Sequence, residues 1–203
     1  REHNDLVETY DLDRVFLSTS LFDTLLAEVP EECRARLVTQ HRMAAPIGEL
    51  ISHTFYGGSL IHDPVAVVAA ETIDDDERVI WFSTSHRSTR HEETRFAGDS
   101  SLANTLEVEQ VCQLVHRLNA GASLGKYHRT DGGKLEILIL SGYRKQCVEI
   151  ERALRRGHRL DNVDVQIKTV DAVQGRESDV VIFSVTRSNL RGELGFLGEP
   201  YEG

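Results

Sequence analysis

The chain has 203 residues, of which 40% are hydrophobic and 28% charged, and its formal net charge is −10 at pH 7. This composition is typical of a globular domain with a buried core, and the negative charge excludes a protein that holds nucleic acid by bulk electrostatics. The sequence has no apolar run of the roughly 18 residues that a membrane span needs. Its three cysteines are far apart, which favours a reducing cytoplasmic or nuclear compartment over a disulfide framework.

The charge is unevenly distributed along the chain. Residues 1–133 carry 12 Lys and Arg against 22 Asp and Glu, whereas residues 134–203 carry 11 of each kind. Any site for a polyanion is therefore expected to be local and to lie mostly in the last third of the chain. The chain starts without a methionine, and we expect it to be a single domain cut from a longer protein.

The first third predicts two helices and one strand. Ser20–Glu28 has the pattern of a short helix with Ser20 as its N-cap, and a strand is expected over Arg36–Thr39. Pro46 suits the first turn of a helix and predicts one over about 46–56.

The middle of the chain predicts one strand, two loops and one long helix. Residues 78–83 follow an acidic turn and predict the strand, and the polar segments 84–103 and 119–134 are expected to be loops. Between the loops, Asn104 and Glu107 have the spacing of a capping box at a helix start. The apolar face of this helix would consist of Val108, Val111, Cys112, Val115 and Leu118.

The last third predicts the core of a sheet. A second helix is expected from Tyr143 to about Gly157. Strands are expected over 135–140, 163–169 and 180–185, and the first and last are nearly continuous apolar runs, typical of strands covered on both faces. Because strands alternate with helices, the predicted fold is α/β with a mostly parallel sheet.

Three polar clusters come directly after expected strands. In an open parallel sheet, ligands bind beyond the carboxyl ends of the strands, so the clusters are expected to share one site at that rim. Their Arg and Lys suit phosphate oxygens, their Gln and Glu suit sugar hydroxyls, and their glycines permit close backbone approach. The sequence shows no metal-ligand spacing among them. The clusters are Gln40–Arg42, Ser141–Gln146, and Val170 and Asp171 followed by Gln174–Glu177.

The same clusters carry a resemblance to a known family. The stretches QHRMAAPIGELISHTFYGGSL, ILILSGYRKQ and KTVDAVQGRESDVVIFSVTRSN resemble, in this order, characteristic segments of Upf1-like superfamily 1 helicases. SLFDTLL and LGFLGEP resemble two further segments of that family, so the resemblance covers most of the chain.

The resemblance implies a three-layer RecA-like P-loop NTPase fold, and specifically the second, C-terminal motor domain of a two-domain helicase. In such motors ATP binds with Mg²⁺ between the two domains, and a single strand of DNA or RNA crosses both in the 5′-to-3′ direction. The chain has neither the GxxxxGK[ST] phosphate loop nor the Asp-Glu magnesium segment. It would therefore supply half of the cleft, with the magnesium ligands on the first motor domain, and alone it is expected to be inactive.

The resemblance also implies roles for individual residues at the nucleotide. Arg42 would reach the γ-phosphate of ATP, with Arg176 as a second catalytic arginine in the cleft. Gln40 and His41 would lie at the nucleotide, and His41 stands where the family has a tyrosine near the adenine. Gly175 and Glu177 would line the cleft, with Glu177 accepting a ribose hydroxyl.

Other residues are implied to face the nucleic acid, and Gln174 would link the cleft to that side. The implied set is Ser141, Tyr143, Thr169, Gln174, Thr186 and Arg187. Two other functional classes stay open at this point: a motor-dead RecA-like interaction module, and part of a helicase-nuclease fusion. The sequence does not choose between DNA and RNA.

Overall fold

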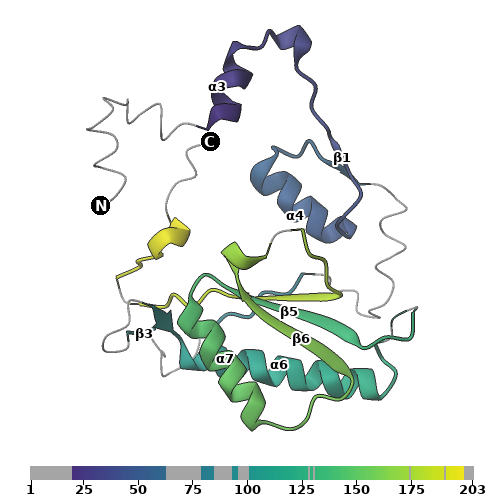
Figure 1. The fold of residues 1–203 in the computed structure, drawn as a ribbon, viewed down its shortest axis with the longest axis vertical. Helices are drawn as coiled ribbons and strands as arrows, with labels where there is room; N and C mark the ends of the chain where they lie inside the picture. The colour runs from purple at the N-terminus through teal and green to yellow at the C-terminus, as the bar shows by residue number, and fades with distance from the viewer. Residues whose placement is uncertain are drawn as a thin grey trace.

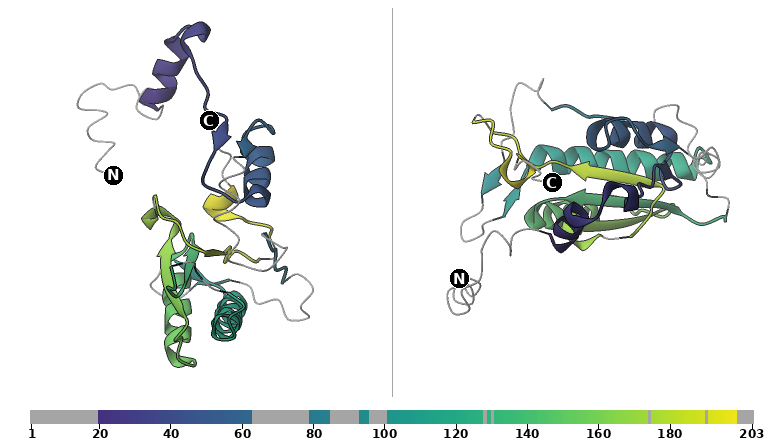
Figure 2. Two further views of the ribbon diagram at one scale, coloured as in Figure 1. Left: turned by 90° about the vertical axis from the view of Figure 1, so that its right-hand side faces the viewer. Right: turned by 90° about the horizontal axis from the view of Figure 1, so that it is seen from above.

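The computed structural model describes residues 20–62, 79–84, 93–95, 101–127, 129, 131–173, 175–189 and 191–198. Its centre is a parallel three-stranded sheet with the strand order β6-β5-β7. Helices α6 and α7 pack side by side against one face of this sheet, and α4 lies on its opposite side (Figures 1 and 2). These elements are β5 (Leu135–Ser141), β6 (Val163–Thr169), β7 (Val180–Ser184), α4 (Ala45–Phe55), α6 (Thr105–Ser123) and α7 (Arg144–Arg156).

The core lies between the sheet and the pair α6 and α7. Ile137 and Ile139 of the central strand β5 are 1% and 0% exposed, and they pack with Val115 of α6 and Ile150 of α7. The predicted α/β class is confirmed, because strands buried in this way need helices to cover them. The apolar rows across the sheet are Val165–Ile137–Val180 and Ile167–Ile139–Ile182.

Strand β7 is less covered than its apolar sequence predicts. Its side chains alternate between buried and exposed, and Val181 and Phe183 are 55% and 47% exposed. The expectation of cover on both faces holds for β5 and is wrong for β7 among the described residues. The buried Ile182 faces the core beneath α6 and α7, whereas Val181 and Phe183 share the opposite face of the strand, which the described residues leave largely uncovered.

The two long helices begin where the sequence predicts. Asn104 caps α6, accepting a hydrogen bond from the Glu107 N–H at 3.2 Å, and α7 runs from the residue after Tyr143 to the residue before Gly157. Helix α6 extends to Ser123, so the prediction of a loop from residue 119 is wrong at its start. In this last part of the helix the Tyr127 ring packs directly against Gly121. Among the described residues, no helix is long and apolar enough to cross a membrane.

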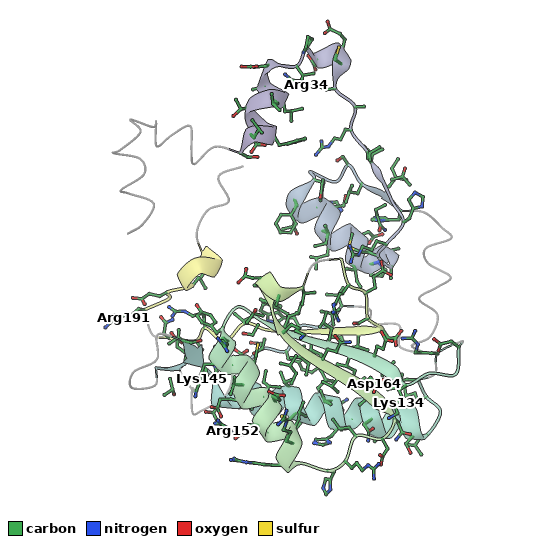
Figure 3. All side chains as sticks on the ribbon, in the orientation of Figure 1. Arg34, Lys134, Lys145, Arg152, Asp164 and Arg191 are labelled. Carbon is green, nitrogen blue, oxygen red and sulfur yellow. The ribbon has the colours of Figure 1, made fainter. Side chains whose placement is uncertain are left out.

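The remaining elements are short. The predicted N-terminal helix is confirmed as α3, and the guanidinium of Arg34 caps its end by donating to the Val29 and Ala27 carbonyls at 2.8 and 3.3 Å (Figure 3). The predicted helix at Pro46 is confirmed as α4, with proline in its first turn. The full set is α3 (Leu21–Glu28), β1 (Thr39–Gln40), β2 (Ile61–His62), β3 (Thr94–Arg95), β4 (Leu102–Ala103) and 3₁₀ turns at Glu31–Cys33, Val170–Ala172 and Gly195–Gly198.

Three strand predictions need correction. The strand expected over 36–39 is instead β1, because only Thr39 and Gln40 have ladder partners on β2, and the pair is separate from the main sheet. Residues 79–83 form no strand and pair with none of the described strands. The segment 84–103, predicted as a loop, contributes β3 and β4, which pair antiparallel.

An ion cluster joins the amino ends of β5 and β7. Arg129 donates to Asp131 and to Asp179 at 3.1 Å and pairs with Glu136 at 2.9 Å. The hydrogen bond from Arg129, followed by that from the Gly133 N–H, holds the pKa of Asp131 below its ordinary value of 3.8. One guanidinium thus pairs with three carboxylates beside the sheet. Within helix α7, Glu149 pairs with Lys145 and with Arg152, both labelled in Figure 3.

We predict that Arg129→Met destabilises the fold near neutral pH and that this effect shrinks in acid. A carboxyl with a lowered folded-state pKa contributes stability above its ordinary value, and the contribution is lost as the pH falls through the folded value. Urea unfolding from neutral pH to below 3.8, the ordinary value of Asp131, measures the difference. Arg155→Met is the control, because its pair with Glu151 is on the exposed helix face. A pH-independent difference would contradict the prediction.

Candidate functional site

The segment from Val170 to Asp179 is a crossover that runs back over the sheet. Because β6 and β7 are parallel and β5 lies between them, the chain must return from the carboxyl end of β6 to the amino end of β7. Arg176 marks the path: its Nη1 donates to Oε1 of Gln166, in the middle of β6, at 2.8 Å. The prediction that this loop presents its side chains at the carboxyl rim is therefore wrong for Arg176, which lies over a sheet face.

Gly175 allows the turn that places Arg176. Its φ is +70°, in the left-handed region that side chains with a Cβ rarely adopt, and no atom lies within 4 Å of the position of a Cβ. The glycine is thus required by backbone conformation and leaves open space beside it. Its neighbour Gln174 lies outside the described residues.

Arg42 meets this crossover from 134 positions away in the sequence. Its Nη2 donates to the Arg176 carbonyl at 2.6 Å, and its Nε lies 3.6 Å from Oε1 of Glu177. The side chains of Arg42 and Glu177 are 54% and 76% exposed, so both keep a large surface for a ligand. The structure therefore brings together Arg42, Arg176 and Glu177, which we call the arginine cluster.

Gln40 shapes the turn that carries Arg42. Its Oε1 accepts the backbone N–H groups of Arg42 and Met43 at 3.0 and 2.7 Å, and its Nε2 donates to the Met43 carbonyl at 2.8 Å. The amide is half-buried and occupied within the chain, whereas His41 beside it is exposed. Gln40 is thus placed to hold Arg42, and the exposed His41 lies next to it in the chain.

A second group of predicted site residues lies at the carboxyl ends of β5 and β7, and part of it is buried. Ser141 and Thr186 are both 0% exposed, and their hydroxyls hydrogen bond to each other at 2.9 Å. In this conformation neither hydroxyl reaches the surface. Among the described residues Thr186 is also the one non-glycine residue with positive φ, at 70°.

The first turn of α6 holds both peptide groups of Thr186. Glu107 Oε2 accepts the Thr186 N–H at 2.9 Å and the Ser184 hydroxyl at 2.5 Å, and Asn104 Nδ2 donates to the Thr186 carbonyl at 3.2 Å. The predicted capping box is therefore half correct. Asn104 caps the helix, but the Glu107 carboxylate turns outward to β7, and the Asn104 N–H donates instead to Gln146 Oε1 at 2.8 Å.

Arg187 is held by acidic partners and is not at the surface. Its side chain is 8% exposed, with Nη1 lying 3.3 Å from Glu93 and Nη2 lying 3.5 Å from Glu193. Glu93 also accepts the Ser188 N–H at 2.6 Å and the Asn189 amide at 3.0 Å. Arg187 therefore fixes the segment after β7.

Thr169 and Tyr143 are the half-buried members of the second group. Thr169 ends β6 and lies in an open groove between that strand and α7, which Arg144 and Lys168 also line. Tyr143 precedes α7, and its hydroxyl lies beside Gly195. These two side chains, with the groove, are the part of the second group that the structure leaves accessible.

Residues 17–201 match the protein family described as AAA domain, AAA_12. The chain belongs to this AAA domain family. It is 28% identical over 200 residues to the DNA polymerase alpha-associated DNA helicase A of Saccharomyces cerevisiae and 30% identical over 195 residues to the regulator of nonsense transcripts 1 homolog of Drosophila melanogaster. It is 29% identical over 194 residues to the ATP-dependent helicase NAM7 of S. cerevisiae.

These alignments cover 90, 92 and 91% of this chain but 27, 15 and 18% of the respective relatives. The chain thus spans less than a third of the length of these relatives. The family match and the relatives agree with the predicted superfamily 1 helicase resemblance, and the α/β fold is of the RecA-like P-loop NTPase type.

Sequence reasoning missed several residues that organise the site. Glu107 was expected to cap the start of its own helix, and no sequence pattern near it indicates its contact with β7. Glu93 lies in a segment expected to be a loop, with nothing to indicate a partner near Ser188. His62, which contacts Gln40 at 3.0 Å, follows the FYGGSL stretch without a motif of its own.

We predict that Glu107→Ala lowers the free energy of unfolding by about 2 to 3 kcal/mol, because it leaves the Thr186 N–H and Ser184 hydroxyl without a charged acceptor. Urea unfolding measures the loss, and hydrogen exchange is expected to show a faster Thr186 amide. Glu109→Ala on the exposed side of the same helix is the matched control. Equal effects of the two substitutions would contradict the assigned role of Glu107.

Proposed function

We propose that this chain is the second motor domain of an ATP-dependent superfamily 1 helicase or translocase that acts on single-stranded DNA or RNA. The observation that carries the proposal is the arginine cluster, in which Arg42 and the crossover residues Arg176 and Glu177 meet with much of their surface exposed. An ion pair as exposed as that of Arg42 and Glu177 contributes little to stability, and both side chains keep a large surface for a ligand.

The donor set of the arginine cluster suits a nucleoside triphosphate. Two guanidinium groups can bind phosphate oxygens and stabilise the charge that develops during phosphoryl transfer. Glu177 can accept a ribose hydroxyl, the open space beside Gly175 leaves room for a ligand, and the exposed His41 can stack on a base. When bound with Mg²⁺, ATP would supply the phosphoryl group, and Arg42 and Arg176 would orient it.

The nucleic acid would follow the other side of the domain. Thr169 and Tyr143 can hold a phosphate or sugar with neutral hydroxyls, which bind a moving strand without trapping it. Arg144 and Lys168 would extend this contact along the groove beside β6. We propose that Gln174 links the two sides, and that Ser141, Thr186 and Arg187 shape this surface from beneath it.

The partner of this half-cleft would be a first RecA-like domain of the same protein, with the phosphate loop and the magnesium ligands. On this proposal the isolated chain does not hydrolyse ATP. Two of the relatives support the assignment by their names, since one is a DNA helicase and another is an ATP-dependent helicase. The proposal leaves the choice between DNA and RNA open. We expect the protein to work in the cytoplasm or nucleus.

We predict that Arg42→Ala lowers the kcat of strand-stimulated ATP hydrolysis by the full-length protein at least about a hundredfold, because a positioned arginine stabilises the transferring phosphoryl group. Arg42→Lys should not restore the rate, since an ammonium cannot reproduce the guanidinium contacts. Arg36→Ala is the control, because Arg36 lies on the same segment and its guanidinium lies 6.0 Å from the centre of the Tyr56 ring.

Hydrolysis is measured with and without single-stranded DNA and RNA, and the nucleic acid that stimulates it more strongly is identified as the one on which the protein acts. A folded full-length protein without hydrolysis under any condition would reject the motor and favour an interaction module. Hydrolysis that is unchanged in Arg42→Ala would reject the role of the arginine cluster.

A further inference from the structure

The side chain of His62 contacts the amide that holds the Arg42 turn. Gln40 Nε2 lies 3.0 Å from His62 Nδ1, across the parallel pair β1 and β2 in which Gln40 and His62 are direct neighbours. The Gln40 amide makes three other hydrogen bonds, all to the backbone of Arg42 and Met43. The contact with His62 uses its one remaining hydrogen.

The orientation of the Gln40 amide follows from its partners. Two backbone N–H groups, those of Arg42 and Met43, point at one terminal atom of the side chain, and that atom must be the oxygen because a nitrogen cannot accept them. The other atom is then the NH₂ group. One of its hydrogens goes to the Met43 carbonyl, and the second points at His62.

The state of the His62 ring follows in turn. A hydrogen bond from Gln40 Nε2 needs a lone pair on Nδ1, so Nδ1 carries no proton and the ring is the neutral tautomer with its hydrogen on Nε2. An imidazolium has a hydrogen on both nitrogens and would oppose the NH₂ group instead of accepting from it. Gln40 cannot turn over to meet it, because its oxygen would then leave the two backbone donors.

Helix α4 prevents the ring from moving away. A Cβ on Gly48 would lie 2.5 Å from the His62 ring and 3.0 Å from Gln40 Nε2, so the helix backbone presses directly on this pair. The charged or titratable residues on the two elements around the ring are His41 and Arg42 after β1, and Glu49 and His53 on α4. Among the described residues, the contact that His62 makes through its ring nitrogen is the one to Gln40.

We propose that His62 is a positioning residue for Arg42: its unprotonated Nδ1 holds the Gln40 amide, and the amide holds the turn that aims Arg42 at the crossover. The consequence for catalysis rests on the function proposed above, whereas the hydrogen-bond arrangement does not.

The first experiment uses this chain and needs no activity. Long-range ¹H–¹⁵N correlation spectra of the imidazole rings at slightly alkaline pH are expected to show His62 with its hydrogen on Nε2. Hydrogen exchange is expected to be several-fold faster at the Arg42 and Met43 amides in His62→Phe, and unchanged in His62→Asn, whose carbonyl oxygen can take the place of Nδ1. A ring with its hydrogen on Nδ1, or equal exchange in both variants, overturns the proposal.

The second experiment uses the full-length protein and its strand-stimulated ATP hydrolysis. His62→Phe is expected to lower kcat roughly three- to tenfold, the effect of one lost hydrogen bond, with KM for the strand unchanged. His62→Asn is expected to keep kcat, because its carbonyl oxygen can take the place of Nδ1 as the acceptor from Gln40. His53→Asn on the exposed side of α4 is the control and should leave kcat as in the wild type.

The two experiments separate the possible failures. If the full-length protein shows no hydrolysis, the proposed motor function fails, and the spectra and exchange rates still decide the role of His62 in holding the turn. If hydrolysis is present but His62→Phe has the same kcat as the wild type, the positioning role of His62 is rejected while the motor function stands.

Discussion

The hydrogen bonds around Thr186 are the constraint on which the arrangement of the site depends. Glu107 and Asn104 bind both peptide groups of a residue in the left-handed conformation, and Ser141 binds its hydroxyl. These contacts join the end of β5, the end of β7 and the start of α6, and Gln146 adds the start of α7 through Ser184 at 2.9 Å. Because a buried polar group without a partner is costly, the members of such a network hold their positions together.

The proposed contact surfaces lie on the two faces of the sheet that this network holds together. On the helix side of the carboxyl ends, Thr169 and Tyr143 are accessible, while Arg187 and its acidic partners hold the segment after β7. On the opposite face of the sheet, the crossover carries Arg176 over β6, where Arg42 reaches it. The sheet itself is therefore the connection between the proposed strand contact and the proposed nucleotide contact, and β6 and β7 are its direct links.

Much of this could be predicted from the sequence, and the failures have physical causes. The helices at Asn104 and Tyr143 and the strands of the central sheet follow from periodicity and capping, which are local properties. Because both residues follow expected strands, the sequence predicted that Arg42 and Arg176 would meet at the carboxyl rim of the sheet. They do meet, but the crossover carries Arg176 over a face of the sheet. The roles of Glu107 and Glu93 depend on partners more than 70 positions away, and no local pattern encodes a contact of that range.

The contact between Arg42 and the crossover goes to a main-chain carbonyl. The position of this carbonyl depends on the path of the backbone, and the hydrogen bond does not require a particular side chain at position 176. The position of Arg42 thus depends on the backbone path of the crossover, in which Gly175 allows the turn. Because the crossover joins β6 to β7 across the central strand β5, the distance between the Arg42 guanidinium and this peptide oxygen depends on the positions of both outer strands.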